Sequence, residues 1–101
     1  MRLRFSPRSR DDLKEIGDYV SRRSPRAAQA LVRTLTDKYA DLVHQPLRFA
    51  VLPHRPELEI RRRVVGCYLI FYTVKDDLVE VVRVLHGARD AESILFPDDE
   101  S

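Results

Sequence analysis

The stretch that decides the fold is "LEIRRRVVGCYLIFYTVKDDLVEVVRVLH", from Leu58 to His86. Its first part, "LEIRRRVV", alternates with the two-residue period of a β-strand, while "CYLIFYTV" and "LVEVVRVLH" are β-branched and aromatic runs. Gly66 separates the first two runs, and Lys75 to Asp77 supply a tight turn between the last two. This part of the chain predicts a three-stranded antiparallel meander.

The residues before the meander begin with a short strand and then change to a helical period. "RLRF" at Arg2 to Phe5 alternates charged and apolar residues, as a strand with one buried face does. Ser6 and Pro7 mark a helix start, because serine accepts hydrogen bonds from the free amides of the first turn and proline loses none there. Apolar residues at helical spacing extend this first helix to about Arg22.

A second helical period follows after a link of one or two residues. Ser24 and Pro25 repeat the start signal, and apolar residues at i, i+3, i+4 and i+7 continue until Pro46. So short a link favours antiparallel neighbours, and we expect a helical hairpin. The three prolines of "QPLRFAVLPHRPE" predict a loop between this hairpin and the meander.

The order of these elements indicates a fold class. Helices and strands are segregated along the chain, which is typical of α+β proteins. We expect one domain over residues 1–101, in which the short N-terminal strand precedes an antiparallel helical hairpin and the hairpin covers one face of a small curved sheet. A short helical turn at "AESIL" is expected to follow the sheet, with Asp90 as its N-cap.

Composition limits the classes of function. The chain has 101 residues, 44% of them hydrophobic and 34% charged, and it has no apolar run of the roughly 18 residues that a membrane helix needs. We therefore expect a cytoplasmic protein. Residues 1–89 hold all 18 Lys and Arg and 11 of the 16 Asp and Glu, a net charge of +7, whereas the last twelve residues hold five acids and no base. A basic body of this kind attracts an anionic partner.

Metal and nucleophile chemistry find little support in the sequence. The histidines at 44, 54 and 86 and the single Cys67 have no close pairing, which makes them a poor zinc set. Cys67 begins an apolar run, so we expect a buried, inert thiol. The three glycines do not form a phosphate-binding loop. We expect no metal and no cofactor.

The segment "VLHGARD", from Val84 to Asp90, is the main candidate for a functional site. His86 at the end of an apolar strand is most simply a hydrogen-bonding residue, and Gly87 permits a positive φ or a close approach of two chain segments. Arg89 carries a guanidinium at the rim of the sheet, which a protein or phosphate partner could grip. We therefore favour a structural strand end whose Arg89 faces a target.

Four segments of the chain resemble ParE-type toxins of the RelE/ParE superfamily, the toxic half of bacterial type II toxin–antitoxin pairs. They span nearly the whole chain in the order and at the spacing of that superfamily. The matching pieces are "SPRSRDDLKEIGDYV" (Ser6 to Val20), "SPRAAQALVRTL" (Ser24 to Leu35), "RPELEIRRRVVGCYLIFYTV" (Arg55 to Val74) and "VVRVLHGARD" (Val81 to Asp90).

The resemblance implies one of two mechanisms. ParE-like members are inhibitors that trap DNA gyrase on cleaved DNA, and RelE-like members are ribosome-dependent messenger RNA endonucleases. RelE-like nucleases share a catalytic tyrosine near the C-terminus, whereas no tyrosine follows Tyr72 here. We therefore expect a gyrase inhibitor without catalytic residues. The nuclease alternative would need arginines beside a proton-transfer group, such as Arg62 or Arg63, Arg83, His86 and Arg89 on one concave surface.

Candidate contacts follow from this expectation. Arg61 and Arg63 share one face of their strand and Arg62 the other, and such arginines are either solvated or part of a cationic patch. The candidates for contact with gyrase, and through it with nucleic acid, are Arg61, Arg63, Arg83, His86 and Arg89.

The resemblance also implies a ParD-like antitoxin as partner. Its acidic, disordered segment could fold into a helix-hairpin groove or add a strand at an open sheet edge. The candidates for this contact are Leu13, Ile16, Val20, Leu31, Leu35 and Arg62, although core is the default role for the apolar ones.

A third class, a plain nucleic-acid-binding module, also fits the basic body. Such a module displays aromatic side chains on a sheet face for base stacking. Tyr68, Phe71 and Tyr72 lie in a run that is too apolar to be mostly exposed, so this class ranks last. Binding that weakens steeply with salt would distinguish it from docking in an apolar groove.

Overall fold

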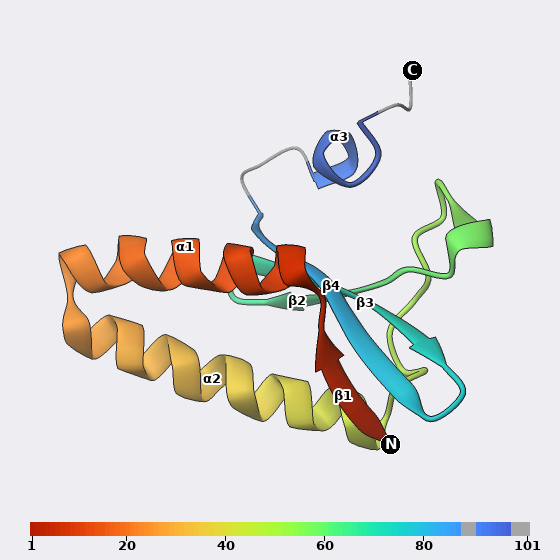
Figure 1. The fold of residues 1–101 in the computed structure, drawn as a ribbon, viewed down its shortest axis with the longest axis horizontal. Coiled ribbons are helices and arrows are strands. Elements are labelled where there is room, and N and C mark those ends of the chain that lie inside the picture. Colours follow the sequence, from red (N-terminus) through yellow and green to blue (C-terminus); the bar gives the residue numbers. More distant parts are fainter. Residues whose placement is uncertain (88–90, 98–101) are drawn as a thin grey trace.

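The computed structural model describes residues 1–87 and 91–97, and it confirms the predicted α+β fold. Figure 1 shows two long helices on one side of a twisted sheet and a short helix on the other side. The elements are β1 (Arg2–Phe5), α1 (Pro7–Arg23), α2 (Pro25–His44), the 3₁₀ turn η1 (Pro56–Leu58), β2 (Arg61–Val65), β3 (Tyr68–Lys75), β4 (Leu78–His86) and α3 (Ala91–Leu95).

The four strands form one open sheet in the order β1-β4-β3-β2. The meander β2-β3-β4 is antiparallel throughout, and β1 pairs in parallel with the first half of β4, where Arg2 lies opposite Leu78 and Phe5 opposite Val81. Because β1 is short, β4 continues beyond Val81 without a neighbouring strand on that side. The first helix fills this position.

The helices begin where the sequence predicted. The hydroxyl of Ser6 accepts a hydrogen bond from the amide of Ser9 at 3.1 Å, and the hydroxyl of Ser24 accepts one from the amide of Ala27 at 3.2 Å. Each cap is followed by a proline in the first turn. Only Ser24 separates the two helices, so they fold back on each other as the expected hairpin. None of the helices in the described ranges has the length and apolar character needed to cross a bilayer.

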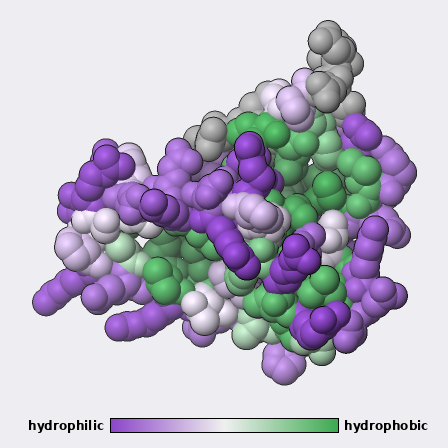
Figure 2. All heavy atoms as spheres, in the orientation of Figure 1, coloured by the Kyte–Doolittle hydropathy of each residue, from purple (hydrophilic) through white to green (hydrophobic). Residues whose placement is uncertain are grey.

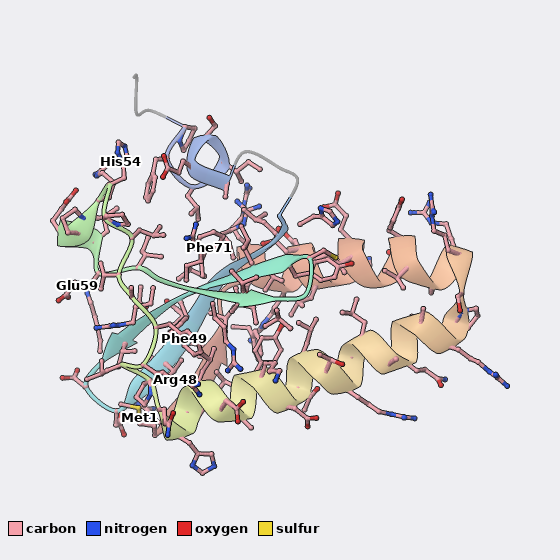
Figure 3. The ribbon with its side chains drawn as sticks, turned by 180° about the vertical axis from the view of Figure 1, so that it is seen from behind. Met1, Arg48, Phe49, His54, Glu59 and Phe71 are labelled. Atoms are coloured by element: carbon pink, nitrogen blue, oxygen red, sulfur yellow. The ribbon has the colours of Figure 1, made fainter. Side chains whose placement is uncertain are left out.

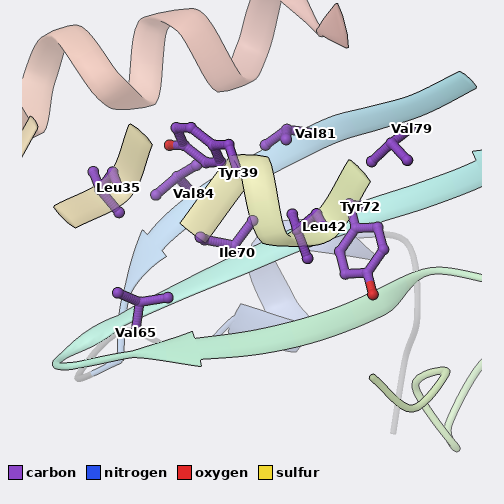
Figure 4. Close-up of a cluster of buried hydrophobic side chains, with 9 residues drawn as sticks. All are labelled: Leu35, Tyr39, Leu42, Val65, Ile70, Tyr72, Val79, Val81 and Val84. Atoms are coloured by element: carbon purple, nitrogen blue, oxygen red, sulfur yellow. The ribbon is translucent and has the colours of Figure 1, made fainter. Parts of the chain in front are cut away.

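The main core lies between α2 and the sheet. Nine buried side chains form it, and Figure 4 shows Tyr39 and Leu42 of α2 standing over the valines of β4 and over Ile70 and Tyr72 of β3. Phe5 packs edge-on against Tyr39, with ring centroids 4.9 Å apart. The complete set is Leu35, Tyr39, Leu42, Val65, Ile70, Tyr72, Val79, Val81 and Val84.

A second, smaller core covers the opposite face of the sheet. Phe71 and Leu85 are fully buried there beneath Leu52 of the loop and Phe96 after α3. In Figure 3 Phe71 points toward the side of α3, whereas Phe49 lies on the side of α2. Phe71 and Tyr72 are thus both buried, on opposite faces, which agrees with the expectation that this run does not display its aromatic rings to solvent.

Two details of the predicted meander were wrong. The strand predicted from Leu58 begins only at Arg61, because Pro56–Leu58 forms a 3₁₀ turn and Glu59 adopts a left-handed conformation with φ 53°. Cys67 is exposed rather than buried, because it lies in the two-residue turn between β2 and β3, where Gly66 has φ 59°. A hydrophobic neighbourhood in sequence did not imply burial at a turn.

Candidate binding surfaces

The helical hairpin carries an apolar groove with a volume of about 240 Å³. Four of the predicted antitoxin contacts, Leu13, Ile16, Leu31 and Leu35, line it. Leu35 is buried and the other three are half-buried, so these side chains serve both the core and the groove wall. Figure 2 shows green, hydrophobic atoms in the space between the two purple helices. The remaining lining residues are Gly17, Ala28, Val32, Thr36 and Tyr39.

The other two predicted antitoxin contacts lie elsewhere. Val20 is half-buried toward the far end of α1 and does not line the groove. Arg62 is exposed on β2, the edge strand of the sheet. The segment before the meander covers the first part of this edge, since the amide of Arg62 donates to the carbonyl of Ala50 at 3.3 Å. The sequence-based set therefore divides between the hairpin and the sheet edge.

The hydroxyl of Tyr39 has no hydrogen-bond partner among the described residues, although it is buried. Burial raises the pKa of this phenol to about 12, because the charged form would lose its hydration. The hydroxyl of Tyr72, on β3, does have a partner: it donates to the carbonyl of Pro46 at 2.9 Å. The two buried tyrosines therefore have opposite hydrogen-bonding states.

Two of the predicted target-binding arginines face the helices and hold the end of α2 and its following loop. Arg63 is only 8% exposed; it donates to the carbonyl of Lys38 at 3.3 Å, and its guanidinium lies 4.7 Å from the ring centroid of Phe49. Arg61 donates to the carbonyl of Phe49 at 2.6 Å. Their hydrogen-bonding groups are therefore used within the fold.

Arg83 is also engaged internally. Its guanidinium forms a two-pronged pair with the carboxylate of Asp12, at 2.7 and 2.9 Å. The same carboxylate accepts a hydrogen bond from the amide of Val84 at 3.0 Å. Asp12 therefore provides a hydrogen-bond acceptor for the part of β4 that has no neighbouring strand. This hydrogen-bonded pairing raises the pKa of Arg83 above its ordinary value. The sequence reasoning missed Asp12, whose signal is a carboxylate between Ser9 and Ile16 on the inward side of an amphipathic helix.

His86 lines a hollow between α1 and the strands β3 and β4. Its ring meets the ring of Tyr68 edge-on, with centroids 5.5 Å apart, because the two residues are opposite each other on β3 and β4. The hollow, about 300 Å³, mixes one guanidinium with two carboxylates. It is lined by Asp12, Glu15, Ile16, Tyr19, Arg22, Tyr68, Val84 and His86. The sequence could not indicate Tyr68, because the contact is made across strands.

The other residues of the "VLHGARD" segment lie beyond the end of β4. Arg89 and Asp90 lie outside the described residues. Gly87 makes a close approach: a Cβ there would lie 3.2 Å from the carbonyl oxygen of Cys67. Across residues 1–87 and 91–97, no three His, Cys, Asp or Glu side chains gather in a way that could hold a metal ion.

Comparison with known proteins agrees with this fold. The sequence matches the family described as "ParE toxin of type II toxin-antitoxin system, parDE" over residues 3–91. It is 36% identical over 78 residues to Toxin RelE2 of Caulobacter vibrioides, which covers 77% of this chain and 85% of that protein.

Two solved structures share the fold. The chromosomal ParDE TA system from P. aeruginosa superposes with a TM-score of 0.68 at 19% identity, covering 85% of this chain and 95% of that one. The toxin–antitoxin complex RelBE2 from Mycobacterium tuberculosis gives a TM-score of 0.60 at 29% identity, covering 84% and 95%. The chain belongs to the ParE toxin family of type II toxin–antitoxin systems.

Proposed function

We propose that this toxin acts by binding DNA gyrase and trapping it on cleaved DNA, and that a cognate ParD-like antitoxin neutralises it. The observation that supports binding rather than RNA cleavage is that Arg63 and Arg83 make their contacts inside the fold. Cleavage without a metal needs cations placed around the phosphate beside a proton-transfer group. Arg83 is paired with Asp12, and Arg63 is stacked on Phe49, so neither is available for a phosphate at His86.

The groove of the hairpin supports the antitoxin part of the proposal. An amphipathic helix can lay apolar side chains into such a groove, and a strand can add to the β2 edge beyond Arg62, where the covering by the preceding segment ends. A basic toxin body also complements an acidic partner segment. The two solved relatives are themselves described as a ParDE system and a RelBE2 complex.

Supercoiling by purified gyrase tests the target. The toxin, freed of antitoxin, should inhibit supercoiling and cause cleaved DNA to accumulate. Arg89→Ala, which changes the candidate target contact of the "HGARD" segment, should weaken both effects. If a folded, monodisperse preparation leaves gyrase unaffected even at high molar excess, the gyrase assignment is wrong.

The antitoxin contact has its own test, with a matched pair of substitutions. Val32 lies in the groove and is 60% exposed, whereas Leu47 is equally apolar and exposed but lies after α2, outside the groove. Val32→Asp should weaken binding of the cognate antitoxin at least tenfold, since it places a charge in an apolar contact, and Leu47→Asp should leave it unchanged. Equal effects of the two substitutions would remove the groove from the proposal.

One observation favours the nuclease as a second candidate. Tyr68 meets His86 across the strands, in a hollow that also contains Arg22, so a His and Tyr pair exists although no tyrosine lies near the C-terminus. The Caulobacter vibrioides relative, which is 36% identical, is named Toxin RelE2. Cleavage of ribosome-bound message that is lost in both His86→Ala and Tyr68→Phe would establish this candidate and displace the gyrase proposal.

A further inference from the structure

The tip of the helical hairpin carries a group of arginines that the proposed gyrase and antitoxin contacts do not use. Residues 19–36, which include the end of α1 and the beginning of α2, contain four arginines and no acidic residue. We call Arg22, Arg23, Arg26 and Arg33 the tip arginines. All four are exposed, and none forms an ion pair with a carboxylate within residues 1–87 and 91–97. Figure 2 shows hydrophilic side chains gathered over this end of the hairpin, which Figure 1 shows reaching beyond the sheet.

Part of this surface is hollowed. A shallow depression of about 290 Å³ on α2 is lined by Arg26, Gln29, Ala30 and Arg33. The two arginines are seven residues apart, and Gln29 lies between them on the same side of the helix, since residues three and four apart are neighbours. The polar lining thus offers two guanidinium groups and an amide, with no carboxylate.

This chemistry matches the phosphodiester backbone of a nucleic acid. A guanidinium has planar donors that fit two phosphate oxygens at once, and glutamine also donates to phosphate oxygens. Each phosphate carries a charge at regular spacing, so several exposed arginines can bind one strand without an apolar anchor. A partner helix or strand commonly also buries apolar side chains in pockets, and Ala30 is the one apolar residue among the described residues that line this depression.

An exposed aromatic ring adjoins the arginines. Tyr19 is 54% exposed, and the guanidinium of Arg23 lies 5.1 Å from its ring centroid. A ring and a guanidinium plane that both face solvent can stack on an unpaired base, a contact that tolerates any sequence. From these observations we propose that the hairpin tip binds the phosphate backbone of nucleic acid, independently of the identity of the toxin's target.

Fluorescence anisotropy with a labelled DNA duplex and with an RNA of the same sequence tests the proposal on the full chain. The wild type should bind at low salt, and affinity should fall steeply as salt rises. Arg26→Ala/Arg33→Ala should lower affinity about tenfold or more and flatten the slope of log K against log salt by about 1.8, because two phosphate contacts are lost. The nucleic acid that binds more tightly, DNA or RNA, is the one whose phosphate backbone the tip recognises.

The matched control removes the same charge elsewhere. Arg8 and Arg10 are exposed in the first turns of α1, at the opposite end of the hairpin. Arg8→Ala/Arg10→Ala should change affinity less than threefold and leave the salt slope unchanged. Equal losses in the two double variants would overturn the proposal, since net charge alone would explain them, and absence of wild-type binding at low salt would overturn it as well.

A competitor distinguishes nucleic acid from an acidic protein segment. Poly-glutamate, at equal charge concentration, should displace the DNA poorly. If it displaces DNA as well as unlabelled duplex does, and if this displacement depends on Arg26 and Arg33, the surface accepts an acidic polypeptide and the nucleic-acid proposal fails.

Discussion

The arginines under the hairpin and those at its tip have the same chemistry and opposite roles. Arg83 forms a two-pronged pair with Asp12, and their side chains are only 12% and 8% exposed. Arg26 and Arg33 are exposed and line a depression without a carboxylate. A buried guanidinium requires partners for its charge and donors, whereas an exposed one is satisfied by water. Burial, rather than residue type, therefore decides which arginines remain available to a partner.

The same difference separates structure from binding in the two regions. Removing Arg83 or Asp12 leaves the other member of the pair buried without a hydrogen-bond partner, which lowers the free energy of unfolding. Loss of Arg26 or Arg33 at the tip removes an exposed side chain without a carboxylate partner in the described residues, and it leaves no buried group without compensation. Substitutions in the two regions should thus divide into those that change stability and those that change binding.

The largest effect is expected at Asp12. Asp12→Ala leaves Arg83 and the amide of Val84 without their acceptor, and it should lower the free energy of unfolding by about 3–5 kcal/mol. Urea denaturation followed by circular dichroism measures this. The neighbouring Asp11 is exposed, and Asp11→Ala should cost less than about 0.5 kcal/mol. Similar losses for the two variants would show that the pair is not a structural centre.

A smaller effect is expected on the central arginines of β2. Arg63→Met removes the donor to the carbonyl of Lys38 and the stacking on Phe49, and should cost about 2 kcal/mol. Arg62 is exposed on the other face, so Arg62→Met should stay within about 0.5 kcal/mol of the wild type. Thermal unfolding of both variants compares them, and a reversed order would contradict the assignment of the two faces.

The two buried tyrosines predict effects of opposite sign. Tyr72→Phe removes a hydrogen bond to Pro46 and should destabilise the protein by about 1 kcal/mol. Tyr39→Phe removes a buried hydroxyl that has no partner among the described residues, and should stabilise it by about 1 kcal/mol. Denaturant titration at pH 7 distinguishes them, and destabilisation by Tyr39→Phe would mean that this hydroxyl is hydrogen-bonded in solution.

The pH dependence of Tyr39 extends the same comparison. Its pKa is raised to about 12 in the folded protein, so the folded state retains the proton that the unfolded chain loses near pH 10. The stabilisation from this group is present below pH 10 and is lost as pH rises to 12. Between pH 10 and pH 12, the free energy of unfolding of Tyr39→Phe should therefore fall less steeply than that of the wild type. Denaturant titrations repeated at several pH values in this interval measure the two slopes.

The smallest effect on stability is expected at the tip. In the variant Arg26→Ala/Arg33→Ala, each substitution should change the free energy of unfolding by less than about 0.5 kcal/mol. The same double variant should show the largest loss of nucleic-acid affinity. A large loss of stability would mean that the tip arginines have structural partners, and the contrast between the two regions would disappear.

The sequence predicted the elements of the fold for local reasons. Serine caps, prolines in first turns and the change of period from helix to strand all act within a few residues, so α1, α2, β3 and β4 were placed almost to their ends. The start of β2 was misplaced by three residues because a left-handed Glu59 interrupts an otherwise alternating pattern. Cys67 was misplaced because an apolar run does not show which of its residues form a turn.

The contacts that define the surfaces depended on tertiary structure. Alternation placed Arg61 and Arg63 on one face, but only the packing of α2 and of the loop after it decided that this face is covered. The distance in sequence between Asp12 and Arg83, or between Tyr68 and His86, carries no local signal, because such pairs form only when the chain closes over long loops. Sequence by itself determined which residues carry charge and which elements they occupy, and the tertiary structure decided which charges are neutralised inside the fold and which remain exposed at its tip.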